Sequence, residues 1–188
     1  VRVNLCVTLF SNLSTFLSNS TSRQTLITNL INLVQSRGAH GVNIDFEGIP
    51  SSQRNNFTTF MTELSTQMHT AIPGSQVSTV LYSVDWNNVF DIPALVPHVD
   101  LFIIMGYGYY YSGSSIAGPN DPLYPFSATS YQVSLSKTIG YYLKEGMPKE
   151  KLVMGLPYYG REWKTQSGAV PTATTSSVGA RTYAQIRN

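Results

Sequence analysis

Two patterns of apolar residues alternate along this chain. Short runs that are apolar throughout, or at every second position, predict strands, and longer segments with apolar residues every third or fourth position predict helices. The predicted strands are residues 1–9, 41–47, 76–83, 101–105 and 152–156. The predicted helices are residues 23–37, 53–71 and 130–144, with a short helix within 89–96. The segments 11–22 and 106–129 are predicted to be loops.

The first two predicted helices have recognisable ends and one apolar face each. Thr21 or Ser22 can cap the first helix and Gly38 can end it, and Pro73 with Gly74 can end the second. The residues expected to face a sheet are Leu26, Ile27, Leu30, Ile31, Leu33 and Val34 in the first helix and Phe57, Phe60, Met61, Leu64 and Met68 in the second. Each helix can therefore cover one side of a sheet.

Strands and helices follow one another strictly, and this order predicts an α/β fold. Connections of helix length between successive strands favour parallel pairing. Both faces of such a sheet are normally apolar. A row of polar side chains inside it is expected where the sheet closes into a barrel and the row lies near the catalytic end.

Residues 40–47, His-Gly-Val-Asn-Ile-Asp-Phe-Glu, contain such a row. In a strand, one face would carry Val42, Ile44 and Phe46, and the other Gly41, Asn43, Asp45 and Glu47. Two carboxylates at positions i and i+2 push each other's pKa values apart, and desolvating one without partners costs several kcal/mol. A half-exposed antiparallel strand would show the same alternation, but the helix-length connections disfavour it. The row therefore predicts an acid that stays protonated near neutral pH.

Composition and charge narrow the classes of partner. Charged residues are 12% of the 188 residues and the net charge is +2, without a basic run, so we expect no nucleic acid. No run approaches the roughly 20 apolar residues that span a membrane, so we expect no membrane association. The single cysteine, Cys6, excludes an internal disulfide and is expected to be a buried thiol. Because the chain opens directly on a strand, we expect it to be the middle of something longer.

Three motifs in this order resemble those of the family 18 glycoside hydrolases, the chitinase-like TIM barrels. Residues 40–47 resemble the fourth-strand signature D-G-x-D-x-D-x-E, residues 105–107 the sixth-strand M-x-Y, and residues 155–161 the seventh-strand G-x-P-F/Y-Y-G-R. The resemblance covers about residues 1–163. It implies an incomplete (β/α)8 barrel containing about strands 3–7, since a complete barrel needs about 250 residues. Residues 1–188 would be a single partial catalytic domain, and about 164–188 would start an insertion after the seventh strand.

The resemblance also implies a mechanism. Family members cleave β-1,4 bonds next to N-acetylglucosamine with retention, and the acetamido oxygen of the substrate is the nucleophile. By similarity, Glu47 would protonate the leaving oxygen and then activate water, while Asp45 would orient the acetamido group and stabilise its positive charge. Asn43 would lie behind Asp45, and Tyr107 would hydrogen-bond the acetamido carbonyl. The implied partner is a polysaccharide containing N-acetylglucosamine, outside the cell or in the cell envelope, and no cofactor or metal is implied.

Further substrate contacts are expected in and after the second and third motifs. By similarity, Tyr158, Tyr159 and Arg161 would line the cleft, and Met105 and Tyr109 are predicted to bind substrate as well. Independently of the family, aromatic residues gather after two predicted strands, where rigid rings make good platforms for sugar faces. The rings are Tyr107, Tyr109, Tyr110, Tyr111, Tyr124 and Phe126 after one strand, and Tyr158, Tyr159 and Trp163 after the other. A loop that packs on itself would be the alternative.

Three positions depart from the family pattern. His40 and Asn43 stand where the motif has Asp, and Gly108 stands where Asp often follows the sixth-strand tyrosine. The buried row thus loses charge but keeps Asp45 and Glu47. An Asn at this place resembles some bacterial members, including those acting on cell-wall glycans. Chitin and peptidoglycan therefore both stay open as substrates, and a catalytically silent sugar-binding module stays open as an alternative.

Two other enzyme classes have less support, and one kind of association is expected. A metal hydrolase would use His40, Asp45 and Glu47, but His69 and His98 lie on other elements without motif spacing. A serine hydrolase is not supported, because no G-x-S-x-G follows a strand. A barrel without all its strands would expose two parallel sheet edges, through which a second copy could pair.

Overall fold

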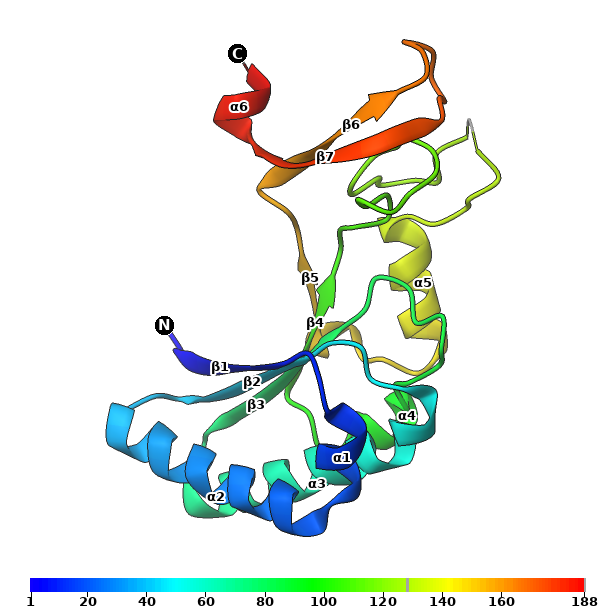
Figure 1. Cartoon of the computed structure of the whole chain (residues 1–188). Helices are drawn as coiled ribbons and strands as arrows, with labels where there is room; N and C mark the ends of the chain where they lie inside the picture. Colours follow the sequence, from blue (N-terminus) through cyan, green and yellow to red (C-terminus); the bar gives the residue numbers. More distant parts are fainter. Residues whose placement is uncertain (128, 188) are drawn as a thin grey trace. The chain divides into compact units, whose positions relative to one another are not determined.

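The structure is a computed structural model that describes residues 1–127 and 129–187 (Figure 1). The predicted loop 106–129 and the predicted insertion 164–188 therefore each contain one residue, 128 or 188, outside the described residues. The chain divides into two compact units. The first unit consists of Val1–Leu81, Asp85–Ile104 and Leu143–Val153, and the second of Tyr82–Val84, Met105–Tyr142 and Met154–Asn188.

Five strands form one sheet in chain order, which confirms the predicted α/β arrangement. They are β1 (Asn4–Leu9), β2 (Gly41–Phe46), β3 (Gln76–Leu81), β4 (Leu101–Met105) and β5 (Leu152–Gly155). The pairs β1–β2, β2–β3 and β3–β4 are parallel, as the helix-length connections predicted. The prediction of a buried Cys6 is wrong, because β1 is an outermost strand and the thiol on it is exposed.

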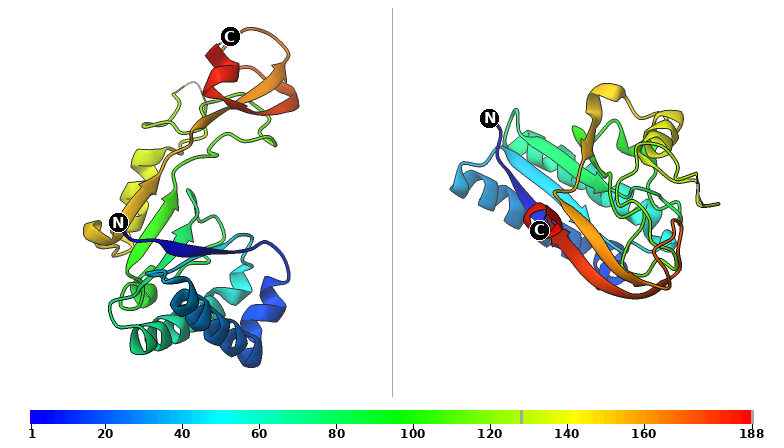
Figure 2. Two further views of the ribbon diagram at one scale, coloured as in Figure 1. Left: turned by 90° about the vertical axis from the view of Figure 1, so that its left-hand side faces the viewer. Right: turned by 90° about the horizontal axis from the view of Figure 1, so that it is seen from above.

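The helices of the first unit cover one face of β1–β3 (Figure 1 and Figure 2). They are α1 (Leu13–Ser18), α2 (Ser20–Arg37), α3 (Arg54–Ala71) and α4 (Ile92–Leu95), with 3-10 turns η1 (Ser51–Gln53) and η2 (Lys149–Lys151). The loop predicted at 11–22 is therefore wrong. Asn19 caps α2 in place of Thr21 or Ser22, because its Oδ1 accepts a hydrogen bond of 2.9 Å from the Ser22 amide.

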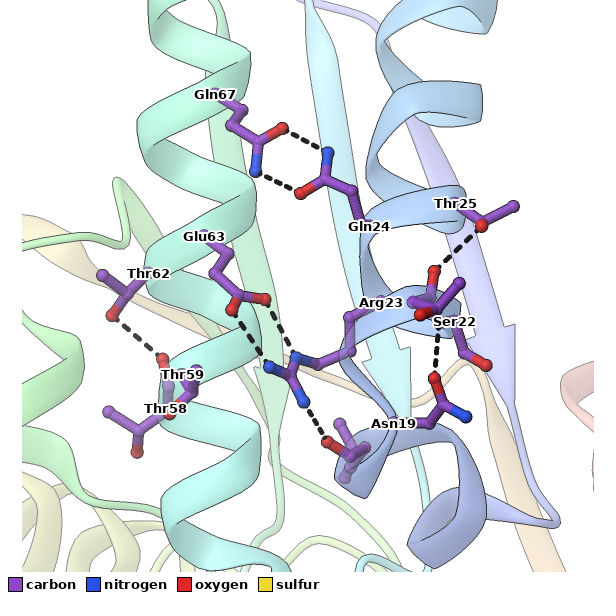
Figure 3. Close-up of polar contacts among 12 residues, drawn as sticks. Asn19, Ser22, Arg23, Gln24, Thr25, Thr58, Thr59, Thr62, Glu63 and Gln67 are labelled. Carbon is purple, nitrogen blue, oxygen red and sulfur yellow. Dashed lines mark hydrogen bonds and ion pairs between the residues drawn. The ribbon is translucent and has the colours of Figure 1, made fainter.

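The core of the first unit consists of the apolar face of β2 and the helices beneath it. All five apolar residues predicted on α3 are buried, and the Phe46 ring of β2 stacks on Phe60 with 5.5 Å between centroids. On α2, however, Leu33 is exposed and Arg23 is buried. The Arg23 guanidinium donates to Glu63 of α3 from Nε (2.9 Å) and NH2 (3.0 Å), as Figure 3 shows. It also donates to the Leu17 carbonyl from NH1 (2.6 Å). This pairing explains why a cation is buried there.

The second unit contains a helix that begins later than predicted and a hairpin that the sequence did not predict. It contains α5 (Leu135–Lys144) up to Tyr142, together with β6 (Tyr159–Thr165), β7 (Thr174–Thr182) and α6 (Tyr183–Arg187). Strands β6 and β7 pair antiparallel, and the Arg181 and Glu162 side chains form an ion pair across them. None of the described helices combines the length and apolar character that crossing a membrane requires.

Candidate active site

The predicted row of polar side chains lies on β2, in the first unit. Val42, Ile44 and Phe46 are buried on one face, while Asp45 and Glu47 on the other face keep partial access to solvent. The row begins at Gly41, where a Cβ atom would lie 1.8 Å from the Gln76 carbonyl oxygen of β3. Glycine is therefore required for β2 to approach β3 this closely.

The amide of Asn43 is held between the two neighbouring strands. Its Oδ1 accepts a hydrogen bond of 2.9 Å from the Ser78 hydroxyl on β3, and its Nδ2 donates to the Cys6 thiol on β1 at 3.7 Å. Both neighbouring strands therefore fix the amide of Asn43, which lies two residues before Asp45. Ser78 was missed at the sequence level, although the alternation within residues 76–83 places it on the polar face of β3.

The two carboxyl groups of the row are both shifted toward the protonated form. Burial raises the pKa of Asp45. Burial also raises the pKa of Glu47, and the charge of Asp45 raises it further. Within the described part of the chain, the buried Oδ1 of Asp45 accepts no hydrogen bond. A buried acceptor of this kind lacks the compensation that water would give it, so the site can accept an N–H donor from a bound molecule.

A second group of predicted residues lies together in the second unit. The rings of Tyr107 and Tyr159 meet edge to face with 6.1 Å between centroids, and the Arg161 guanidinium lies 5.6 Å from the centre of the Tyr159 ring. The side chain of Asn120, which was not among the predicted site residues, joins the segment after Tyr107 to the segment that carries Tyr159. It accepts from the Gly108 amide at 3.0 Å and donates to the Tyr159 carbonyl at 3.3 Å.

Met105 is the last residue of β4, lies two residues before Tyr107 and is partly buried. The next residue, Gly106, donates from its amide to the Gly155 carbonyl at 2.9 Å. A Cβ atom at Gly106 would lie 2.7 Å from that same oxygen. Close contact at this glycine therefore fixes the start of the segment that carries Tyr107.

Tyr158 is the most exposed of the predicted aromatic residues, at 97% of its maximum. It borders a largely apolar hollow of about 510 Å³ in the second unit. The lining residues are Pro157, Tyr158, Tyr159, Gly160, Tyr183 and Ile186. An open surface that combines rings with hydroxyl groups is suited to the face of a sugar.

The structure places Tyr109 differently from the prediction of a substrate contact. Its side chain is 2% exposed, and its hydroxyl shares a 2.6 Å hydrogen bond with the Thr138 hydroxyl, which donates to the Ser83 carbonyl at 2.5 Å. Tyr110 is also buried, whereas Tyr111 and Tyr124 are exposed. The loop therefore packs on itself at Tyr109 and Tyr110, and only part of it offers rings at the surface.

Two of the histidines considered for a metal hydrolase have other partners. The Nδ1 atom of His40 accepts a 3.0 Å hydrogen bond from the Val3 amide, and His69 pairs with Asp100 at 3.0 Å. Among residues 1–127 and 129–187, no group of three or more His, Cys, Asp and Glu side chains could hold a metal ion.

Comparisons of this chain with a family model and with known proteins agree on one family. Residues 8–188 match the model of the glycosyl hydrolases family 18. The chain is 29% identical over 180 residues to a probable endochitinase of Caenorhabditis elegans, covering 87% of this chain and 28% of that protein. It is also 29% identical over 168 residues to the putative sporulation-specific glycosylase YdhD of Bacillus subtilis (strain 168), covering 85% of this chain and 37% of that protein. The chain thus spans about a third of the length of these curated relatives.

A solved structure has a similar fold. It is catalytic domain 2 of a Group II chitinase from Ostrinia furnacalis in complex with penta-N-acetylchitooctaose, which superposes with a TM-score of 0.80 at 22% identity. The alignment covers 97% of this chain and 51% of that structure. The similarity shows a TIM-barrel-like α/β fold, of which this chain forms a part.

Proposed function

Because the chain belongs to the glycosyl hydrolases family 18, we propose that it hydrolyses β-1,4 bonds in polymers of N-acetylglucosamine, such as chitin. The reaction would retain the anomeric configuration, with the acetamido group of the substrate as nucleophile. The observation that carries this proposal is the pair Asp45 and Glu47 on the polar face of β2. Burial and the charge of Asp45 both favour the protonated form of Glu47, which is the form that a general acid needs.

Each residue of the row has a separate role in the proposed reaction. Glu47 protonates the leaving glycosidic oxygen and then takes a proton from the attacking water. Asp45 accepts the acetamido N–H at its unpartnered Oδ1 and stabilises the positive charge that develops on that group. Asn43, held by Ser78 and Cys6, keeps the polar face of the strand in place behind Asp45.

The residues of the second unit are proposed as substrate contacts from their places in the family motifs. Tyr107 would donate a hydrogen bond to the acetamido carbonyl, and Tyr158, Tyr159 and Arg161 would contact the sugar chain. Met105 would contribute a contact next to Tyr107. The burial of Tyr109 supports a packing role for it and argues against direct contact with substrate.

Peptidoglycan is the second candidate substrate. One relative is a putative sporulation-specific glycosylase, and Asn43 replaces a carboxylate of the family signature. An N-acetylglucosaminidase acting on peptidoglycan would use the same row and the same acetamido chemistry. Either polymer would be met outside the cell or in the cell envelope.

The test is the turnover of chitopentaose and of peptidoglycan fragments by the chain and by Glu47→Gln, followed by chromatography of the products. We expect Glu47→Gln to lose about a thousandfold in rate, which is within the range of general acid catalysis, while binding is kept. Proton NMR should show the β-anomer as the first product. Glu150→Gln, which removes an exposed carboxylate of η2, is the matched control and should retain the full rate.

Two results would contradict this proposal in different ways. Full activity of Glu47→Gln would remove Glu47 from the mechanism. Binding of the oligosaccharide without any product from the unmodified chain would instead favour a catalytically silent sugar-binding module.

A further inference from the structure

The segment between β3 and α4 forms a turn that is hydrogen-bonded to itself. The Asn88 amide donates to the Asp85 carbonyl at 3.1 Å and closes a turn with Trp86 and Asn87 at its tip. The two oxygens of the Asp85 carboxylate accept from the amides of Val89 (2.9 Å) and Phe90 (3.0 Å). Each of these bonds restricts the backbone next to the tip, so the turn has little freedom to move.

The same turn is anchored to the core of the first unit. Val89 and Phe90 are buried, and the Phe90 ring meets Phe57 of α3 edge to face at 5.7 Å between centroids. The Arg54 guanidinium donates to the carbonyls of Asn88 (2.8 Å) and Phe90 (2.6 Å). Both of these bonds come from NH1, and the NH2 atom of Arg54 lies 3.6 Å from Asp91 Oδ1.

The Arg54 contacts connect this turn to the segment that carries Glu47. Arg54 is the first residue of α3, and residues 47–53 are the link from β2 to that helix. Strands β2 and β3 are parallel, with Ile44 beside Thr79, so both segments leave the same edge of the sheet. A single side chain therefore holds the turn in a fixed relation to the start of the helix that follows Glu47.

Trp86, at the tip of this anchored turn, is 69% exposed. Its neighbour Asn87 is exposed as well and carries a neutral amide that can bond to hydroxyl groups. Exposing an indole to water is unfavourable, and a ring that is already held in place loses little entropy when a ligand covers it. These are the properties of a binding platform for a flat, partly apolar surface.

From this arrangement we propose that Trp86 is a platform on which a pyranose ring of the polysaccharide stacks, and that Arg54 positions it. The inference rests on the proposed function, because it concerns the same edge of the sheet as Glu47. The ligand is one ring of a β-1,4-linked N-acetylglucosamine chain, whose C–H face covers the indole while Asn87 bonds to hydroxyl groups. Trp86 binds sugar in this account and takes no part in the bond cleavage.

The composition of the chain allows a direct test by fluorescence. The chain has two tryptophans, so Trp163→Phe leaves Trp86 as the single indole reporter. In a Glu47→Gln background, which prevents turnover, titration with chitopentaose should shift and change the emission of Trp86 until it saturates. The midpoint should agree with the Kd measured by calorimetry on the same protein.

Variants at the platform test the same inference by affinity. Trp86→Ala should weaken chitopentaose binding about tenfold, and Trp86→Phe should retain most of the affinity, because it keeps a ring. Arg54→Lys should reduce the fluorescence change and the affinity together. Leu33→Ala, which removes an exposed apolar side chain of α2, is the control and should leave binding unchanged.

The outcomes separate this inference from the proposed function. Chitopentaose binding by calorimetry with no change in Trp86 emission, or with full affinity in Trp86→Ala, would overturn the platform and leave the proposed function in place. Absence of both binding and turnover with every N-acetylglucosamine polymer would overturn the proposed function and the platform together.

Discussion

Burial acts on ionisable side chains in both units of the molecule, with opposite chemical results. In the first unit it raises the pKa values of Asp45 and Glu47 toward neutral pH, where a carboxylic acid can give up and take back a proton. In the second unit it raises the pKa of Tyr109 above its already high value. The same physical cause therefore brings the pKa of a carboxyl group nearer to neutral pH and takes the pKa of a phenol further from it.

The partners of these groups differ in the same way. The Tyr109 hydroxyl is bonded to Thr138, so the ring is fixed as part of the packing. The Oδ1 atom of Asp45 is buried without a hydrogen-bond donor among the described residues. A satisfied polar group contributes to stability, whereas an unsatisfied one costs stability and is available to a ligand. Burial is therefore common to Asp45 and Tyr109, and the state of their hydrogen-bond partners is what separates them.

The contrast between Tyr109 and Asp45 can be tested by mutation, and the largest expected effect is a loss of stability when the Tyr109 side chain is truncated. Tyr109→Ala should reduce the free energy of unfolding by about 4 kcal/mol, as expected for truncating a fully buried aromatic side chain. The measurement is unfolding by urea, followed by circular dichroism. Tyr158→Ala is the matched control, because Tyr158 is exposed, and it should change stability little. Equal stability of the two variants would show that Tyr109 does not belong to the packing.

A smaller effect is expected when only the hydroxyl of Tyr109 is removed. Tyr109→Phe keeps the ring and should cost about 1 kcal/mol, since one buried hydrogen bond is lost and the Thr138 hydroxyl still reaches the Ser83 carbonyl. Tyr111→Phe serves as the control, because the Tyr111 ring is exposed, and it should be nearly neutral. If Tyr109→Phe reduced the free energy of unfolding as much as Tyr109→Ala does, the hydroxyl group and not the ring would make the main contribution of Tyr109 to stability.

Much of the first unit could be predicted because its signals are local. The alternation of Val42, Ile44 and Phe46 with polar residues identifies a strand and its two faces, and the stripe on α3 identifies the side that packs on it. Arg23 could not be predicted in the same way. Its burial depends on Glu63, which lies on another helix and cannot be recognised from the neighbours of Arg23 in sequence.

The second unit was predicted less well because its residues fit more than one structure. Strand β7 has the sequence Thr-Thr-Ser-Ser-Val-Gly-Ala-Arg-Thr, in which no apolar alternation indicates a strand. Tyrosine has an apolar ring and a polar hydroxyl, so the run Tyr109, Tyr110 and Tyr111 fits a core or a surface equally well. The partners of each hydroxyl decide between the two, and these partners come from distant segments. The hydrogen bonds from Arg54 to the turn at Trp86 were not predicted either, because they too join distant segments.

The smallest expected change concerns the charge of Asp45 and its influence on Glu47. Asp45→Asn removes that charge and keeps the shape of the side chain, so the pKa of Glu47 should fall. It should stay above its ordinary value, because burial, the larger cause, is unchanged. Carbon-13 NMR of the Glu47 carboxyl group in the two proteins measures this directly and does not depend on activity. The Glu150 signal, from an exposed residue on η2, serves as the internal reference.

The raised pKa values of Asp45 and Glu47 also determine the direction in which stability changes with pH. A carboxyl group whose pKa is raised in the folded chain favours folding at low pH, and this contribution is lost as the pH rises through the folded-state pKa. At neutral pH, Asp45→Asn combined with Glu47→Gln should therefore raise Tm, and the gain should disappear below about pH 4, where carboxyl groups are protonated in the unfolded chain as well. A Tm at neutral pH that falls in this variant would mean that the two carboxylates stabilise the fold. The row on β2 would then be a structural feature like Tyr109, and the contrast between the two units would no longer hold.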